Sequence, residues 1–390
     1  MARSFNFHFP TQVICGVGVR REIALEAKKI GAKRAFVVTG MGSTKNSPYL
    51  QEIVESLKAE KIAVQMFSEV ESDPSFETVE KGAAAAKKFK ADLIVAYGGG
   101  SPMDAAKFIN VLLEGEGKVS DYARGKKVAT KMSLPLFCLP TTAGTASEIS
   151  RAAVVKDVKG GEKLSISNLA FCPDIAFLDP EPQLTMPASI AAATGMDALT
   201  HAIEGFLSVH SNPISDAAGL EAIYQISKWL RPSVGHSDNL EARSEMLIAS
   251  MIAGIAFLGP GTGGVHSIAH ILGGQYGIPH GVANGMMLPY VMEYSRIANP
   301  EKFARIAKAF GEPTDDMTIL EASYAAVEAA EMLRDDLGLP CCLEELGIPK
   351  KDLPKIAKMA TGQRSAANNV RKLEEKDFLT ILLSAYSHQH

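Results

Sequence analysis

Short apolar runs alternate with amphipathic segments through the first half of the chain, and this alternation constrains the fold more than any other feature. The runs are rich in β-branched and other apolar residues and lie at 34–39, 62–67, 92–97, 134–140 and 174–179. Segments 48–60 and 76–89 have the spacing of amphipathic helices. Such alternation predicts βαβ units around a mostly parallel sheet. The nearly continuous apolar character of the runs fits strands buried on both faces.

The alternation ends at a proline-rich stretch that contains Pro180, Pro182 and Pro187, and no convincing strand follows it. Helical spacing instead occupies 188–209, 213–230, 240–258, 264–274, 300–311, 318–336 and 352–361. We therefore expect an α/β, Rossmann-like dinucleotide-binding domain over residues 1–185. An all-helical domain is expected over residues 186–390.

Composition narrows the class of protein. Of the 390 residues, 46% are hydrophobic and 22% are charged, and the net charge is −4, which argues against binding to nucleic acid or an anionic membrane. No apolar run approaches the ~18 residues of a membrane span, and the N-terminus lacks the apolar core of a signal peptide. The five cysteines match no zinc-thiolate spacing. We expect reduced thiols, a cytoplasmic location and a homo-oligomer, a dimer or larger.

A glycine-rich loop at 96–107, AYGGGSPMDAAK, follows one predicted strand and opens a predicted helix. Glycines let backbone amides approach a pyrophosphate, and the free amides of a helix start bind its oxygens. Asp104 falls in the first helical turn, where the helix dipole favours a carboxylate. The loop does not match G-x-G-x-x-G, because the sixth residue counted from Gly98 is Met103. A strand-to-helix turn without a ligand is the alternative.

A second polar loop at 139–148, LPTTAGTASE, also follows an apolar run. Hydroxyl groups and exposed amides suit phosphate, ribose or amide groups. On its own the loop is equally a turn that caps the next segment. Two such loops after two strands of one sheet favour a nucleotide crevice. The hydroxyls belong to Thr141, Thr142, Thr145 and Ser147.

Two segments of the helical half carry candidate metal ligands. Asp197 and His201 are four residues apart, which places them on one helix face. His266 and His270 are also four apart, and His280 follows ten residues later. One carboxylate with two or three histidines suits Fe(II), Zn or a related ion, and an open coordination position would make the site catalytic. The alternative for each histidine is a core imidazole with satisfied hydrogen bonds.

Four stretches together resemble the iron-containing (group III) alcohol dehydrogenases of the dehydroquinate synthase-like superfamily. They are GGGSPMDAAK, PTTAGTASE, GMDALTHAIE and GVHSIAHILGGQYGIPHGVANGMMLP, and the last two are highly specific in this order and spacing. The resemblance runs from about residue 5 to the C-terminus. It implies an α/β dinucleotide-binding domain, a helical metal-binding domain and an active site in the cleft between them. It also implies Fe²⁺, with Zn²⁺ possible, and NAD(H), with NADP(H) possible.

The resemblance also implies roles for individual residues. The metal ligands would be Asp197, His201, His266 and His280, while His270 would lie near the metal and the nicotinamide and relay a proton. Asp73 would lie near the adenosine, and Lys163 would contact the cofactor. The pyrophosphate would be held by Gly98, Gly99, Gly100 and Ser101 with Asp104, and the cofactor cleft would be lined by Thr141, Thr142, Thr145 and Ser147.

Two departures from the family pattern bear on specificity. Gly40 stands where many NAD-preferring members have an aspartate that binds the ribose 2′-OH and repels a 2′-phosphate. No clear arginine for a 2′-phosphate is nearby, so NAD is favoured over NADP. In TGQRSAANNVRKL (361–373), Asn369 and Arg371 remain but the family's cysteine and proline are missing. That segment borders the substrate pocket in the family, so substrate identity does not carry over.

The expected function is a metal-dependent alcohol dehydrogenase or aldehyde reductase that transfers hydride between NAD(P)(H) and a short-chain alcohol or aldehyde. An anionic substrate, bearing a carboxylate or sulfonate, is an alternative if Arg151 and Arg364 lie near the cleft. A zinc-dependent polyol dehydrogenase of the glycerol type is a second alternative. A non-catalytic metal- or nucleotide-binding scaffold is a third.

Overall fold

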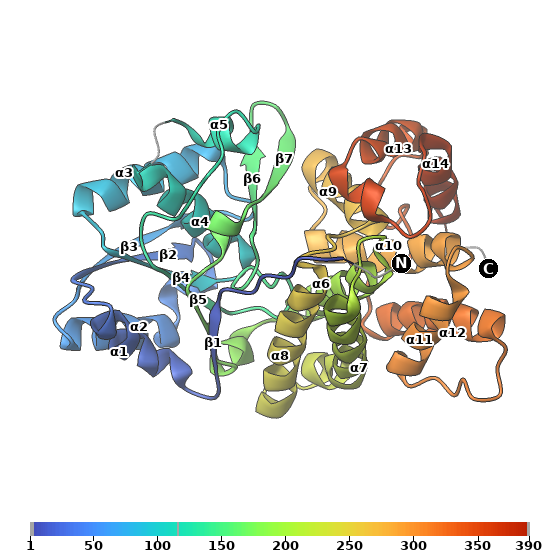
Figure 1. Cartoon of the computed structure of the whole chain (residues 1–390), viewed down its shortest axis with the longest axis horizontal. Helices are drawn as coiled ribbons and strands as arrows, with labels where there is room; N and C mark the ends of the chain where they lie inside the picture. The colour runs from blue at the N-terminus through green and yellow to red at the C-terminus, as the bar shows by residue number, and fades with distance from the viewer. Residues whose placement is uncertain (1–3, 115–116, 388–390) are drawn as a thin grey trace. The chain divides into compact units, whose positions relative to one another are not determined.

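The computed structural model describes residues 4–114 and 117–387 and divides into two compact units (Figure 1). One unit is Phe9–Met186, and the other starts at Pro187 and includes the described residues before Phe9. The sequence expectation placed residues 1–8 with the sheet, whereas those described among them join the helical unit. A stretch without helical or strand periodicity contains no signal that assigns it to either unit.

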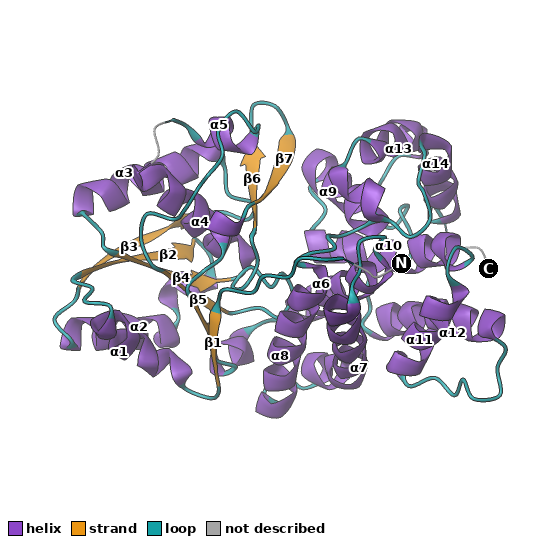
Figure 2. Ribbon diagram, in the orientation of Figure 1, coloured by secondary structure: helices purple, strands orange, loops and turns teal. Residues whose placement is uncertain are grey.

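A six-stranded parallel sheet forms the centre of the Phe9–Met186 unit (Figure 2). The strand order is β1-β8-β5-β4-β2-β3. The five apolar runs became five of these strands, and β1 was not predicted because it is short and its residues are only partly buried. The bounds are β1 (Gln12–Cys15), β2 (Arg34–Gly40), β3 (Ala63–Val70), β4 (Leu93–Gly98), β5 (Leu136–Pro140) and β8 (Ile175–Leu178).

Helices cover both faces of this sheet, which explains the continuous apolar character of its central strands. Alternate residues of a strand point to opposite faces. Phe36 and Val38 of β2 lie in one buried cluster, with residues of α3 and α4. Ala35 and Val37 lie in the other, with residues of α1 and α2. The helices are α1 (Ile23–Lys29), α2 (Pro48–Ala59), α3 (Phe76–Phe89), α4 (Gly100–Glu114) and α5 (Val119–Ala123).

An antiparallel hairpin, β6 (Ala152–Asp157) with β7 (Glu162–Ser167), lies outside the main sheet. The sequence analysis missed it because its strands mix charged, polar and apolar residues. The Lys156 amide donates to the Pro74 carbonyl at 2.8 Å. The hairpin therefore attaches to the loop that follows β3.

The second unit is helical in its described part, and seven of its helices match the predicted segments. Two more, α10 and α14, were not predicted; α10 contains Pro289 and two glycines, which disfavour a helix by propensity. A Cβ at Gly281 would overlap the Ala193 carbonyl oxygen, so this glycine lets α10 pack directly on the α6 backbone. The bounds are α6 (Ala188–Leu207), α7 (Pro213–Gly235), α8 (Leu240–Phe257), α9 (Gly264–Tyr276), α10 (His280–Arg296), α11 (Pro300–Phe310), α12 (Ile319–Asp336), α13 (Leu353–Thr361) and α14 (Glu375–Ser384).

Short 3₁₀ helices complete the described structure: η1 (Val19–Glu22), η2 (Ser43–Asn46), η3 (Leu169–Phe171), η4 (Glu181–Thr185), η5 (Lys350–Asp352) and η6 (Arg364–Asn368). Across residues 4–114 and 117–387, every helix is too short or too polar to cross a membrane.

Candidate functional site

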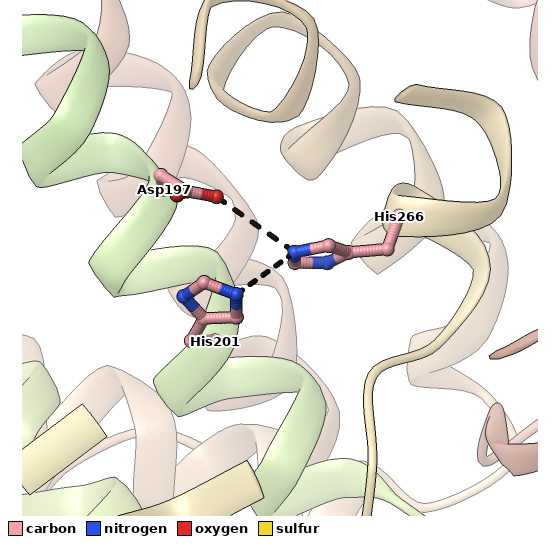
Figure 3. Close-up of side chains that lie close together, drawn as sticks. All are labelled: Asp197, His201 and His266. Carbon is pink, nitrogen blue, oxygen red and sulfur yellow. Dashed lines mark hydrogen bonds and ion pairs between the residues drawn. The ribbon is translucent and has the colours of Figure 1, made fainter. Parts of the chain in front are cut away.

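Helices α6 and α9 bring three candidate metal ligands together inside the helical unit (Figure 3). Asp197 and His201 lie one turn apart on α6, and His266 lies on α9. The Nε2 atom of His266 is 3.0 Å from Nε2 of His201 and 3.7 Å from Oδ1 of Asp197. All three side chains are buried, and their ligand atoms lie within 4.8 Å of one another.

The fourth candidate ligand, His280, is the first residue of α10, with Pro279 as its N-cap. Its Nε2 atom lies 3.7 Å from Oδ1 of Asp197, the same carboxylate oxygen that faces His266. The side chain of His280 is 29% exposed, whereas that of His266 is 3% exposed. The ligand atoms of the four residues therefore surround one position in the structure. The buried Asp197, His201 and His266 close this position on the side of α6 and α9, and the partly exposed His280 leaves it open to solvent.

The position of the Asn284 side chain indicates that the space between the four ligands suits a cation. Its Nδ2 atom lies 2.6 Å from Asp197 Oδ1, 3.1 Å from His280 Nε2 and 3.3 Å from His266 Nε2. One electropositive amide group thus sits among three of the four candidate ligand atoms. Nitrogen ligands about 2.1 Å from a tetrahedral ion lie about 3.4 Å apart, close to the observed His201–His266 separation. Three imidazoles and a carboxylate therefore fit a divalent cation such as Fe²⁺ or Zn²⁺.

The protonation states favour the same chemistry. Burial acts to raise the pKa of Asp197, but His201, His280 and His266, with the Asn284 hydrogen bond, outweigh burial and lower it. Burial, and then the neighbouring His201, holds the pKa of His266 well below its usual range. A charged carboxylate and a neutral imidazole are the forms that bind a metal ion.

Sequence analysis missed two residues that support the ligands. Glu204 Oε2 lies 2.6 Å from His266 Nδ1, and Glu204 Oε1 accepts the Val265 amide at 2.7 Å. Burial raises the pKa of Glu204 to about 7. The other missed residue is Asn284, one turn after His280. The spacing was the available signal, because both residues lie three or four positions after a predicted ligand on the same helix.

His270 lies beside the cluster without joining its closest group. Its ring is stacked on that of His280, with centroids 5.3 Å apart, and lies 6.0 Å from the His266 ring. It is partly exposed, unlike His266. This placement is consistent with the proton-handling role expected from the sequence.

In the sheet unit, the two polar loops meet where neighbouring strands end. Strands β4 and β5 pair in register through Gly98 and Pro140, and the Thr141 amide donates to the Gly98 carbonyl at 2.9 Å. A Cβ at Gly99 would lie 3.3 Å from the Thr142 hydroxyl, and one at Gly100 would lie 2.9 Å from Thr145 Cγ2. The contact at Gly100 means that any larger residue there would force Thr145 to move. The sheet also reverses its strand order between β2 and β4, where ligands of open α/β sheets bind.

Two predicted cofactor residues, Asp104 and Ser147, bond to the protein itself. Asp104 Oδ1 accepts the Ser147 hydroxyl at 2.7 Å, and Asp104 Oδ2 accepts the Val154 amide at 2.9 Å. The buried Lys107 ammonium donates to the Ser147 hydroxyl at 2.9 Å. Burial raises the pKa of Asp104. This pair ties α4 to the threonine loop and to β6, so both residues position the loops.

The remaining predicted cofactor residues gather around the glycine loop. The Asp73 amide donates to the Ser101 hydroxyl at 3.1 Å, and the Asp73 carboxylate pairs with Lys163 at 2.6 Å. Gly40 ends β2, and a Cβ placed there would lie 3.7 Å from Pro102 of the same loop. Asp73 has a φ of 57°, a left-handed conformation that asparagine and aspartate tolerate better than most residues.

Comparisons with known proteins identify both units. Residues 10–180 match the model of "Iron-containing alcohol dehydrogenase", and residues 191–386 match "Fe-containing alcohol dehydrogenase family, C-terminal". A 1,3-propanediol dehydrogenase of Citrobacter freundii is 39% identical over 98% of this chain and 99% of that protein.

Two solved structures agree with the fold described above. A crystal structure of a 1,3-propanediol oxidoreductase superposes with a TM-score of 0.95 at 37% identity and covers 98% of this chain and 100% of its own. A sulfoacetaldehyde reductase from Bifidobacterium kashiwanohense in complex with NAD⁺ superposes with a TM-score of 0.91 at 28% identity and covers 100% of both chains. The resemblance seen in the sequence and the expected fold class are thereby confirmed. The chain belongs to the iron-containing alcohol dehydrogenase family and is a metal-dependent, NAD-using enzyme that interconverts alcohols and aldehydes.

Proposed function

We propose that the enzyme interconverts a short, uncharged alcohol and its aldehyde, with 1,3-propanediol and 3-hydroxypropanal as the first pair to test. The observation that carries this proposal is the 39% identity to a 1,3-propanediol dehydrogenase along nearly the whole of both chains. The ligand set formed by α6, α9 and α10 supplies the chemistry. NAD(H) is the proposed cofactor partner, in line with the NAD⁺ complex of a related reductase.

Asp197, His201, His266 and His280 would hold the divalent cation. When bound, such a cation polarises a substrate oxygen and lowers the pKa of an alcohol. In its charged form, Glu204 would accept a hydrogen bond from the proton on His266 Nδ1, so that Nε2 presents its lone pair to the other ligands. His270, stacked on His280 and partly exposed, accepts and returns the hydroxyl proton.

The two loops at the ends of β4 and β5 would bind the cofactor. Backbone amides at the start of α4, freed by the glycines before it, suit the pyrophosphate. The hydroxyls of Thr141, Thr142 and Thr145 line the same edge. Asp104, Ser147 and Lys107 hold this edge in place through the hydrogen bonds given above. Hydride transfer itself belongs to the nicotinamide.

Two variants separate ligand from proton carrier. His280→Ala should lose bound metal and activity together, whereas His270→Ala should keep its metal and turn over more slowly. Metal content by mass spectrometry and NADH oxidation with 3-hydroxypropanal measure both. Full turnover by a metal-free His280→Ala would overturn the ligand assignment. Loss of metal from His270→Ala would make His270 a ligand.

An anionic aldehyde is the second candidate substrate. Arg151 is only partly exposed, and its Nε atom is buried without a hydrogen-bond partner among the described residues. The related sulfoacetaldehyde reductase gives the class of substrate to test. A higher kcat/KM for sulfoacetaldehyde than for 3-hydroxypropanal, abolished in Arg151→Gln, would favour this candidate over the uncharged one.

We also propose a homodimer or larger oligomer and a cytoplasmic location. Exposed apolar side chains on α12 support self-association, among them Ile319, Leu320 and Met332. The absence of a disulfide from all five cysteines supports a reducing compartment. Light scattering after size exclusion tests the first proposal, and a monomeric mass would refute it. Cell fractionation tests the second, and recovery of the enzyme outside the cytoplasm would refute that.

A further inference from the structure

A second group of metal-binding side chains lies in the connector between α12 and η5, outside the candidate active site. Cys341 and Cys342 are adjacent in the sequence, and Glu345 follows three residues after Cys342. The Sγ atom of Cys341 lies 3.0 Å from Oε1 of Glu345, and the Sγ atom of Cys342 lies 3.7 Å from the same oxygen. Each of the three offers one ligand atom, and these atoms lie within 4.8 Å of one another.

These separations are those of ligands around one small ion. With zinc–sulfur distances of about 2.3 Å and zinc–oxygen distances of about 2.1 Å, ligand atoms at tetrahedral angles lie about 3.6 Å apart. The two Sγ–Oε1 distances bracket that value. Adjacent cysteines lack the two-residue spacer of ordinary zinc-thiolate motifs, and the carboxylate of Glu345 supplies the third donor that the spacing alone does not predict.

The backbone of the connector is already fixed in the arrangement that the ligands need. The Cys341 amide donates to Glu345 Oε2 at 3.1 Å, which orients the carboxylate toward the thiols. The Tyr290 hydroxyl of α10 donates to the Cys341 carbonyl at 2.8 Å. The Leu343 amide donates to the Ala385 carbonyl at 2.8 Å, just beyond α14. Because the connector is already ordered, ion binding requires little of the loss of conformational entropy that ordering a flexible loop would require.

The three side chains differ in solvent exposure, so an ion can reach the group from its exposed side. Cys342 is buried, Cys341 is half-buried and Glu345 is exposed. Burial, and then the Glu345 carboxylate, raises the pKa of Cys341. A cation that binds the two sulfur atoms displaces their protons, because the thiolate is the form that ligates a metal. Thiolates are soft donors that select Zn²⁺ or Cd²⁺ over Fe²⁺ and Mg²⁺.

We propose that Cys341, Cys342 and Glu345 form a second metal site for a thiophilic divalent cation such as Zn²⁺. The site differs in donor chemistry from the imidazole and carboxylate site on α6, α9 and α10. A bound ion would link Cys341 and Cys342 to Glu345 within the connector. The connector is already hydrogen-bonded there to Tyr290 of α10 and to Ala385 after α14. The stabilising effect of the ion adds to these hydrogen bonds.

Cadmium titration of the reduced, iron-loaded enzyme tests the site, because thiolate–cadmium bonds produce an ultraviolet charge-transfer band and imidazole–carboxylate sites do not. The starting protein should show five titratable thiols after denaturation. We expect a band that saturates at one Cd²⁺ per chain and is displaced by Zn²⁺. His266→Ala should keep the band, which separates this site from the candidate active site.

Variants of the three residues decide the assignment. Cys341→Ser and Cys342→Ser should each weaken cadmium binding at least tenfold and reduce the band, and Glu345→Gln should weaken binding with the band retained. Cys15→Ser is the matched control, since Cys15 is an exposed cysteine of β1 and should leave the titration unchanged. Zn²⁺ should raise the Tm of the wild-type enzyme and not that of Glu345→Gln, an exposed position that should fold normally. No band at one equivalent, an unchanged band in both serine variants, or failure of Zn²⁺ to compete would each overturn the proposal.

Discussion

Replacing Glu204 by glutamine should weaken metal binding without touching a metal ligand. In the structure, the carboxylate accepts the Val265 amide through Oε1 and faces His266 Nδ1 through Oε2. A glutamine oxygen can keep the Val265 bond, and its NH₂ group then faces His266 Nδ1. That imidazole nitrogen becomes an acceptor, so the proton of the neutral ring moves to Nε2. The lone pair that a metal needs is lost from the atom that faces Asp197 and His201.

The magnitude follows from this tautomer switch. Loss of an outer partner of a ligating histidine costs roughly 10–100-fold in metal affinity, or about 1.4–2.7 kcal/mol. Competition with a chromophoric chelator measures the Kd for Co²⁺ or Zn²⁺ in both proteins. Activity at saturating metal should recover most of the wild-type value, because all four ligands remain.

Glu328→Gln is the matched control, since Glu328 is exposed on α12 and carries the same change of charge. Its metal affinity should equal that of the wild-type enzyme. A Kd for Glu204→Gln within twofold of the wild-type value would refute the argument that the carboxylate sets the His266 tautomer. So would an equal loss of affinity in the control.

Three further predictions concern the sheet unit. Gly40→Asp should lower kcat/KM for NADPH relative to NADH by at least about tenfold through repulsion of a 2′-phosphate, and an unchanged ratio would place the ribose elsewhere. Burial raises the pKa of Glu148 from 4.5 to about 7, so the folded state binds this proton more tightly and stability falls as pH rises through that window. Urea unfolding should show a loss of roughly 3 kcal/mol in wild type that Glu148→Gln lacks, and parallel pH curves would contradict this. Arg20→Gln should lower the unfolding free energy by about 3–5 kcal/mol, because Arg20 is buried against Asp179 at 2.8 Å; a loss below about 1 kcal/mol would not fit.

The sequence predicted best where a long periodic pattern coincided with the final environment. The run at 92–97 became β4 because strands covered on both faces need apolar residues throughout. Helix α10 was missed because its glycines and Pro289 disfavour a helix locally, and packing against α6 overrides that preference. The β6–β7 hairpin was missed because its apolar run, residues 152–155, is only four residues long and β7 mixes charged, polar and apolar residues.

Some features of the candidate site could be predicted from the sequence, and others depend on contacts between distant segments. The four-residue spacings of Asp197 with His201 and of His266 with His270 placed each pair on a helix face. Which histidines converge depends on the packing of three helices, and only the resemblance to a family suggested His280 over His270. The spacing of Glu204 after His201 places it on the ligand face of α6, but its partners Val265 and His266 are distant in sequence, so spacing alone does not reveal its role. The adjacent Cys341 and Cys342 match no ordinary metal-site spacing.

The direct contact of Gly281 with the α6 backbone has a consequence for how the enzyme tolerates change. Two backbones in contact have no side chain between them that can adjust. Helix α10 and helix α6 therefore shift together, and the histidine at the start of one keeps its distance from the carboxylate on the other. Substitutions on α11, which packs against α7 and α12, can then accumulate while the coordination geometry stays the same. A single methyl group at Gly281 would disturb that geometry more than many distant replacements.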